Sequence, residues 1–247
     1  MCTVKSMEVS KTNKPKPGSL LLIGIPGPGL IGTLSLTYII HSLKMDYYGE
    51  IQNSPSTVIF VDNGQIIGPI RIYKKDKIFA ILSDVPIDYE LSVGFTESVI
   101  DFVKKNSIET IVFLTGIHVS DKKPENLKTY GLVTNDGMDS LLYENDIPKF
   151  LSGAIAGPES AVITYLKNSG ISTLILLTEC NFFFPDPESA MHTIQTLSKI
   201  LKIPIDLADF KKQIDFLRLQ NRQLMEETLN VMQQEKDQSS VPPQIYK

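Results

Sequence analysis

The chain has 247 residues, of which 42% are hydrophobic and 21% are charged, and its net charge at pH 7 is −4. This length and composition can bury one full core, and one large domain with a C-terminal extension fits better than two equal domains. The chain carries only three arginines, Arg71, Arg218 and Arg222, so no nucleic-acid surface is expected.

The amino-terminal residues 1–18 contain four lysines but no arginine and no apolar stretch. We expect a disordered lead-in rather than a targeting peptide. The longest apolar runs, 20–25 and 171–177, are too short to cross a bilayer, so no membrane association is expected. The two cysteines, Cys2 and Cys180, indicate no disulfide framework and a reducing compartment, so the expected location is the cytoplasm.

In the body of the chain, residues 19–205, runs of Leu, Ile and Val alternate with segments of helical period. This pattern predicts an α/β fold with a mainly parallel sheet covered by helices on both faces. The expected strands are 19–25, 57–61, 69–73, 77–83, 109–115, 151–155 and 171–177. The expected helices are 29–43, 88–105, 136–145, 158–168 and 187–201. Turn signals at Asp62-Asn-Gly64 and Lys74-Lys-Asp76 predict antiparallel hairpins at an edge of the sheet.

A glycine-rich loop follows the first expected strand, with Gly27, Gly29 and Gly32 in the spacing G-x-G-x-x-G. The same spacing between a strand and a helix is the fingerprint of dinucleotide binding. However, Pro26 and Pro28 remove N–H groups from the turn that would hold a pyrophosphate. We interpret the segment as a structural loop that brings the next helix close to the sheet, and nucleotide binding stays as the alternative.

No motif in the sequence identifies an enzyme. The three histidines lack metal-ligand spacing and no nucleophile elbow occurs, so neither a metal, a cofactor nor a catalytic triad is expected. If the fold held an active pocket, its candidates would be the polar residues at the ends of expected strands and helices, Asp84, Ser160 and Glu179. Such residues are more often caps and hydrogen-bond partners, and the prediction is a protein without catalysis.

Four segments of the body form one further pattern. They are Gly24-Ile-Pro-Gly-Pro-Gly-Leu-Ile-Gly32, Gly153-Ala-Ile-Ala-Gly157, Thr173-Leu-Ile-Leu-Leu-Thr-Glu179 and Asp186-Pro-Glu-Ser-Ala190. Over residues 19–212 the chain resembles the archaeal branch of the proteasome assembly chaperone family. The resemblance implies a fold similar to nucleoside phosphorylases without established catalysis and a homo-oligomer, with a tetramer favoured. It also implies a C-terminal hydrophobic-Tyr-x tail that binds the proteasome α-ring.

The segment 206–236 has the period of a coiled coil, with seam residues at alternating spacings of three and four. The candidate oligomerisation residues are Leu207, Phe210, Ile214, Leu217, Asn221 and Leu224, and the seam continues through Thr228 and Val231. Two interpretations stay open, a stalk that joins copies of the chain and the last helix of the globular body. Asn221 favours the stalk, because a polar residue at one seam position fixes the register and the number of partners.

The last segment, 237–247, contains serines and paired prolines that cannot continue a helix, and a flexible tail is expected. It ends in Ile245, Tyr246 and Lys247. An aliphatic side chain, a phenol and an α-carboxylate on one short peptide offer a pocket three contacts. This is the docking signature of proteasome activators and assembly factors. We therefore expect ATP-independent docking to the α subunits of the proteasome core particle. The alternatives are a nucleoside- or nucleotide-binding enzyme and an unrelated structural oligomer.

Overall fold

The computed structural model describes residues 3–5, 18–52, 59–62, 64–87, 89–120, 122, 124–181 and 185–212. The chain divides into two compact units, residues 1–206 and residues 207–247. The first unit contains every named helix and strand, and the described part of the second is 207–212.

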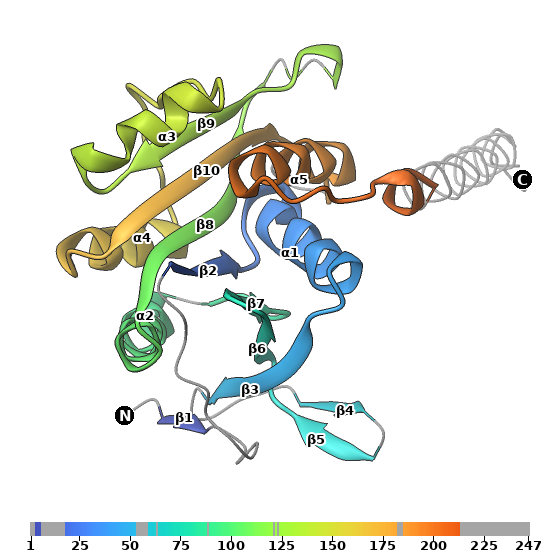
Figure 1. Cartoon of the computed structure of the whole chain (residues 1–247), viewed down its shortest axis with the longest axis vertical. Helices are drawn as coiled ribbons and strands as arrows, with labels where there is room; N and C mark the ends of the chain where they lie inside the picture. The colour runs from blue at the N-terminus through green and yellow to red at the C-terminus, as the bar shows by residue number, and fades with distance from the viewer. Residues whose placement is uncertain are drawn as a thin grey trace, which may run out of the picture. The chain divides into compact units, whose positions relative to one another are not determined.

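An eight-stranded sheet runs through the first unit (Figure 1). Its four central strands are parallel to one another and lie in the order β7 (Ile78–Ser83), β2 (Ser19–Gly24), β8 (Ile108–His118) and β10 (Ser172–Cys180). Antiparallel strands extend the sheet beyond β7, namely β6 (Ile70–Lys75), β3 (Asp46–Gln52) and β1 (Thr3–Lys5). Beyond β10 the sheet ends in antiparallel β9 (Thr129–Val133).

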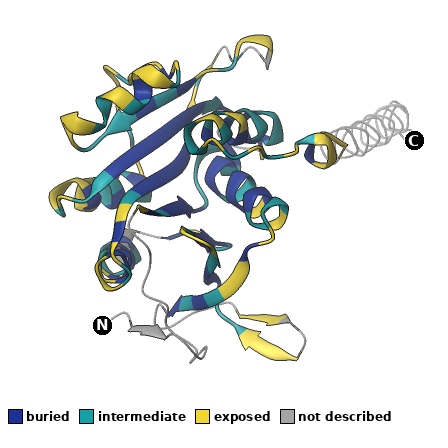
Figure 2. Cartoon of the chain, viewed as in Figure 1, coloured by how far each residue is buried: buried dark blue, intermediate teal, exposed yellow. Residues whose placement is uncertain are grey.

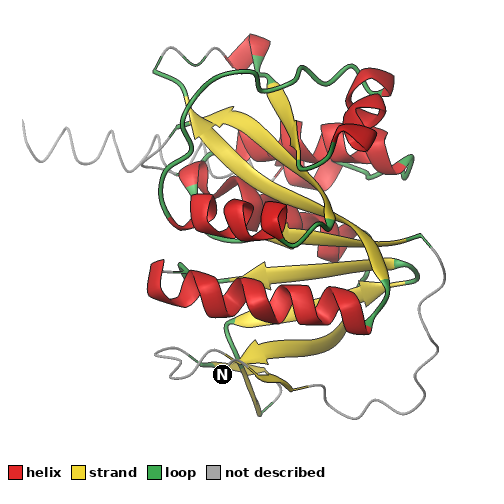
Figure 3. Cartoon of the chain, turned by 90° about the vertical axis from the view of Figure 1, so that its left-hand side faces the viewer, coloured by secondary structure: helices red, strands yellow, loops and turns green. Residues whose placement is uncertain are grey.

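Two pairs of helices cover the two faces of the sheet (Figures 1 and 3). On one face α1 (Ile31–Ser42) packs against α5 (Pro187–Leu201), and on the other α2 (Tyr89–Lys105) packs against α4 (Pro158–Asn168). A short helix, α3 (Asp139–Glu144), follows β9. Three single turns of 3₁₀-helix also occur in the described part of the chain, η1 (Pro28–Leu30), η2 (Pro124–Asn126) and η3 (Asp136–Met138). Within the described part of the chain, no helix has the length and apolarity that a membrane span requires.

Successive side chains of β2 point to opposite faces of the sheet, and both faces of this strand are covered by helices. Leu21 and Ile23 are fully buried in the cluster that contains Phe95 of α2 and Val162 of α4. The opposite face of β2 meets α1, because a Cβ at Gly24 would lie 2.9 Å from the Cβ of Leu36. The central strands are accordingly dark blue over most of their length in Figure 2. Burial on both faces explains why such a strand is rich in consecutive apolar residues. The predicted α/β fold with a mainly parallel sheet is confirmed.

Among the predicted elements, the strand at 151–155 is wrong. The structure has no strand there, and Leu151 is 86% exposed. The place beside β10 belongs to β9, which the sequence pattern did not predict. Its Gly131 leaves room for the side chain of Leu142 of α3, whose Cδ2 would lie 2.2 Å from a Cβ at this position. A short strand with a central glycine has a weak sequence signal.

Both predicted antiparallel hairpins are present, but neither lies at an edge of the large sheet. Residues Phe60–Asp62 (β4) and Gln65–Ile67 (β5) pair antiparallel around the predicted turn, but they form a separate two-stranded sheet. The second hairpin joins β6 to β7, and both strands lie inside the large sheet. On its other side β6 pairs with β3, which the sequence pattern did not predict either. The Asp, Gly and Glu residues of β3 lower its strand propensity.

Candidate functional site

The glycine loop lies at the carboxyl edge of the parallel strands, where it leads from β2 through η1 into α1. Gly29 has a φ of +62°, and a Cβ there would lie 2.9 Å from the Cβ of Cys180. A Cβ at Gly32 would lie 2.5 Å from the carbonyl oxygen of Leu114 in β8. The first turn of α1 therefore touches the sheet through its backbone, which requires a residue without a side chain.

Asp186 joins the loop to α5. Its N–H donates to the carbonyl of Gly29 at 2.9 Å, and its carboxylate accepts from the amides of Asn181 at 3.0 Å and Ser189 at 3.2 Å. The same carboxylate pairs with Lys122, and both side chains are buried. Burial acts to raise the pKa of Asp186, but these donors outweigh it and hold the pKa below its ordinary value. Two of the segments that carry the family resemblance are thus in direct contact.

A second buried carboxylate approaches the loop from the first turn of α4. A Cβ at Gly27 would lie 2.0 Å from Oε1 of Glu159 and 3.4 Å from Oγ1 of Thr115 in β8. The other oxygen, Oε2, faces Gly157, where a Cβ would lie at 3.1 Å. Glu159 is 4% exposed, and burial raises the pKa of its carboxyl despite a hydrogen bond from its own amide. Among the described residues, Glu159 forms no ion pair.

The helices α4 and α5 both begin with Pro-Glu-Ser-Ala, but their glutamates differ. In α5, Asp186 caps the helix with its side chain and Glu188 is half-buried. In α4 the residue before the proline is Gly157, which has no side chain to cap with, and Glu159 is buried. An acidic residue in a first helical turn is ordinary in sequence, so the sequence offered no signal that singled out Glu159.

The three candidates for an active pocket do not share a site. Asp84 forms an ion pair with Arg71 of β6. Glu179 accepts a hydrogen bond of 2.9 Å from the hydroxyl of Tyr130, and the hydroxyl of Ser160 donates to a backbone carbonyl of its own loop at 2.7 Å. The strands that end near Asp84 and Glu179, β7 and β10, are three strand spacings apart, about 14 Å. Each of the three residues therefore interacts with partners in a different part of the fold.

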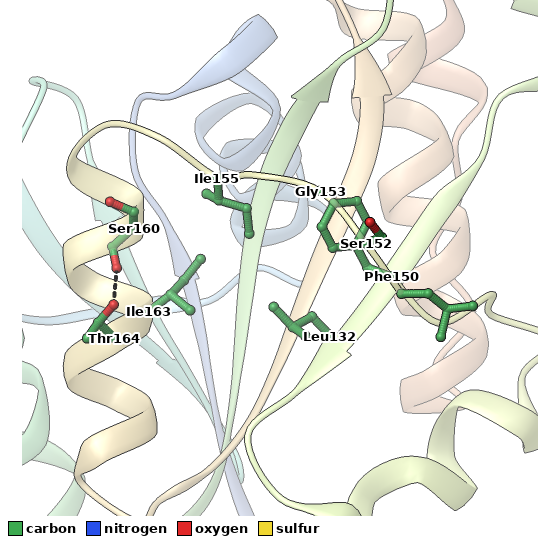
Figure 4. A pocket seen from close by; sticks show the side chains of 9 residues that line it. Leu132, Phe150, Ser152, Gly153, Ile155, Ser160, Ile163 and Thr164 are labelled. Carbon is green, nitrogen blue, oxygen red and sulfur yellow. Dashed lines mark hydrogen bonds between the residues drawn. The ribbon is translucent and has the colours of Figure 1, made fainter.

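An open pocket of about 340 Å³ lies between α4 and the segment 150–155 (Figure 4). Its apolar lining includes Leu132, Phe150 and Ile163. The hydroxyl of Thr164 donates to the carbonyl of Ser160 at 2.7 Å rather than into the pocket. The complete lining is Leu132, Phe150, Leu151, Ser152, Gly153, Ile155, Ser160, Ile163 and Thr164. The lining holds the hydroxyl groups of Ser152, Ser160 and Thr164, but no carboxyl, imidazole, amine or thiol group.

A buried polar network connects β9, β10 and α5. The hydroxyl of Thr129 lies 2.9 Å from Nδ1 of His192 and 2.8 Å from the hydroxyl of Thr178, which lies 2.7 Å from that of Thr193. Its members come from three elements, so no local sequence pattern joins them. Within the residues that the structure describes, no three His, Cys, Asp or Glu side chains gather in a way that would hold a metal ion.

The remaining predicted site residues fall mostly beyond the described part of the chain. The tail residues Ile245, Tyr246 and Lys247 lie outside it, as do the seam residues Ile214, Leu217, Asn221 and Leu224. Leu207 and Phe210 lie in the described residues, where Lys211 donates to the carbonyl of Leu207 at 2.9 Å. The docking tail and the coiled-coil seam stay predictions.

Comparison with known proteins places the chain among relatives of similar length. The model of the PAC2 family matches residues 21–225. The uncharacterized protein MJ0106 of Methanocaldococcus jannaschii is 22% identical over 233 residues, which cover 93% of this chain and 94% of the relative.

Two solved structures from Pyrococcus furiosus share the fold. PbaA, described as an archaeal homolog of proteasome-assembly chaperone, has a TM-score of 0.80 at 20% identity, covering 91% of this chain and 94% of PbaA. PbaB, described as an archaeal proteasome activator, has a TM-score of 0.74 at 18% identity, covering 91% of this chain and 98% of PbaB. At these identities the likeness establishes a common fold.

Proposed function

The chain belongs to the PAC2 family, and from this premise we propose that it is a proteasome-binding protein of the assembly-chaperone or activator type. It docks its last three residues into pockets of the α-ring of the core particle. The observation that carries the proposal is the coincidence of a PAC2 body with the terminal sequence Ile245-Tyr246-Lys247. The descriptions of PbaA and PbaB, which share the fold, support the same role.

Each group of the tail has a distinct part in this docking. The side chain of Ile245 supplies apolar contact, and the ring of Tyr246 adds a larger apolar area with a hydroxyl at its tip. The α-carboxylate of Lys247 pairs with a cationic group of the pocket, a charge-assisted contact of about 1.5–3 kcal/mol. The side chain of Lys247 takes no part in the contact and tolerates substitution.

The folded body presents the tail and takes no catalytic part. Asp84, Ser160 and Glu179 are each engaged by neighbouring groups and do not form a common site. In the proposed function the protein acts without ATP. We further propose that the protein is a cytoplasmic homo-oligomer, in which the seam from Leu207 to Leu224 joins several copies and so presents several tails to one ring.

The proposal is tested by binding to purified α-rings. Tyr246→Ala, and separately one additional residue after Lys247, should abolish binding while the melting temperature and the oligomeric mass stay unchanged, because neither change touches the described body. The matched control is Tyr143→Ala, which removes another tyrosine that is 78% exposed on α3. This variant should bind like the unmodified protein. A tail-extended protein that keeps full affinity would refute docking through the terminal carboxylate.

A further inference from the structure

The pocket beside α4 lies next to the most exposed large apolar side chain among the described residues. Leu151 is 86% exposed and lines the pocket of about 340 Å³ together with Phe150 and Ile163 (Figure 4). If each carbon atom takes about the volume of a water molecule, roughly 30 Å³, the pocket has room for the four carbon atoms of a leucine side chain. One surface therefore carries both an apolar projection and an apolar pocket of matching size.

The segment 151–157, which forms much of this surface, carries no charge. Its sequence is Leu-Ser-Gly-Ala-Ile-Ala-Gly, and all of its residues except Ile155 are exposed. The complete lining of the pocket is likewise uncharged. Of the charged residues that flank the segment, Lys149 pairs with Asp139 at 2.8 Å and Glu159 is buried. Two copies of this surface can therefore approach each other without repulsion between like charges.

The backbone of the segment 151–155 also lacks a neighbouring strand. The sequence pattern predicts a strand here, but within the part of the chain that the structure describes, none of these residues exchanges a hydrogen bond with another backbone group. The last backbone contact before the segment is made by Phe150, whose N–H donates to the carbonyl of Gly131 in β9 at 2.8 Å. A segment with the composition of a strand and no neighbouring strand can pair with another chain.

The position of Leu151 beside the pocket selects the kind of partner. In a two-fold contact between identical chains, the same surface patch is used by both copies, so every contact is made twice. An axis that passes between Leu151 and the pocket places the leucine of each copy in the pocket of the other. A residue near such an axis also faces its own counterpart, so a charge there would be repelled. The uncharged surface and the adjacent leucine both fit a second copy of the chain.

We propose that two copies of the chain bind each other through this surface, with Leu151 of each copy in the pocket of the other. Thr164, which is exposed where α4 borders the pocket, lies beside the incoming leucine. The contact lies in the folded body and is independent of the seam at 207–224 and of the docking tail. Its failure would therefore leave both of those proposals untouched.

The test is the mass of the full chain in solution, measured by analytical ultracentrifugation over a range of protein concentrations. Leu151→Asp should raise the dissociation constant between copies by about a hundredfold, because each of the two symmetric leucine contacts contributes about tenfold. Thr164→Lys, which places a charge at the pocket, should lower the mass in the same way. The matched control is Ile66→Asp, which places the same charge on a side chain that is 72% exposed on β5. It should leave the mass unchanged.

A mixture of Leu151→Asp and Thr164→Lys tests whether the contact is reciprocal. In a mixed pair, one contact joins the unmodified leucine to an unmodified pocket, and the other joins the introduced aspartate to the introduced lysine. Mixing should therefore restore the association that each variant lacks alone.

The folded state of the variants is checked by their melting temperatures, which should be unchanged because both positions are exposed. If one variant does not fold, the other still gives the comparison with Ile66→Asp. The inference is overturned if the unmodified chain is monomeric at every concentration, or if the folded variants keep its mass. An equal loss of mass in Ile66→Asp, or a mixture that stays dissociated, overturns it as well.

Discussion

Asp186 and Lys122 form an ion pair with 4% and 8% of their side chains exposed. A buried pair of this kind often contributes little beyond an apolar replacement, but the loss of one partner leaves the other charge buried and unpaired. Asp186 also accepts from two amides at the start of α5 and in the loop after β10. The carboxylate thus links the segment that contains Lys122, the loop after β10 and the first turn of α5.

We expect Asp186→Asn to lower the free energy of unfolding by about 3–5 kcal/mol, because Lys122 would stay buried without its counter-charge. Urea unfolding followed by circular dichroism measures the change. Asp209→Asn is the control, since the pair of Asp209 with Lys212 has both side chains 79% exposed and should contribute little. Equal effects of the two substitutions would show that burial does not govern the pair at Asp186.

His192 adds a dependence of stability on pH. Its pKa lies below the ordinary value of 6.5, first because of burial and second because of Lys199, while Glu179 acts in the opposite direction. The unfolded chain therefore binds a proton more readily than the folded one. Stability from this group is complete above the unfolded pKa and is lost as the pH falls through 6.5 toward the folded pKa.

Melting temperatures measured between pH 7.5 and pH 5 should accordingly fall, and the fall should be shallower in His192→Gln. The control is His41→Gln, whose histidine is exposed at the end of α1. This control should reproduce the original decline. A decline of the same steepness in His192→Gln would mean that other groups cause it.

At the scale of elements, two glycines distinguish the cost of a left-handed backbone conformation from the cost of steric crowding. Gly29 has a positive φ and close neighbours, whereas Gly64, in the turn between β4 and β5, has a φ of +76° and no atom within 4 Å of where a Cβ would lie. The cost of the left-handed conformation is common to both sites, about 1–2 kcal/mol for a residue with a Cβ. Of these two positions, only Gly29 is crowded.

Gly64→Ala should therefore lower the free energy of unfolding by about 1–2 kcal/mol, and Gly29→Ala by clearly more, because its Cβ would press on Cys180 and on the carbonyl of Asn181 at 3.0 Å. Urea unfolding of the two variants gives the difference. A smaller loss at Gly29 than at Gly64 would indicate that the loop can move away from β10 at little cost.

The C-terminal seam makes a prediction of its own. If Asn221 occupies a seam position between copies, Asn221→Leu should raise the melting temperature and broaden the distribution of oligomeric masses, because the residue that fixes the partner number is lost. Light scattering coupled to size exclusion measures the masses. Asn230→Leu changes an asparagine off the seam and should leave them as they are. One sharp, unaltered mass in Asn221→Leu would argue against the coiled coil.

At the scale of the whole molecule, the proposed function depends on several tails acting together. A synthetic peptide of residues 238–247 should bind the α-ring roughly 10²–10⁴-fold more weakly than the full chain, because linked copies turn later contacts into intramolecular ones. Surface plasmon resonance on immobilised rings gives both affinities. The peptide with Tyr246→Ala, which should not bind, is the control. A peptide as tight as the protein would remove the need for an oligomer.

Much of the fold could be predicted from the chain alone. The helices at 158–168 and 187–201 agree with α4 and α5 because a proline marks each first turn and an apolar stripe follows it. The doubly covered strands β2, β8 and β10 could be predicted because each contains a run of four consecutive apolar residues. The resemblance to the family and the α/β fold are likewise confirmed, since they depend on short segments that can be recognised one at a time.

What the sequence by itself determined is whatever a local pattern can encode, namely the type of element, its caps, the family segments and the terminal motif. The tertiary structure alone decided which of two identical Pro-Glu-Ser-Ala starts has a buried glutamate, and that Asp186 reaches back to Gly29 across 157 positions of the chain. It also decided that β9 rather than 151–155 pairs with β10. The physical reason is that burial and charge pairing depend on neighbours distant in sequence, and a local pattern carries no information about them.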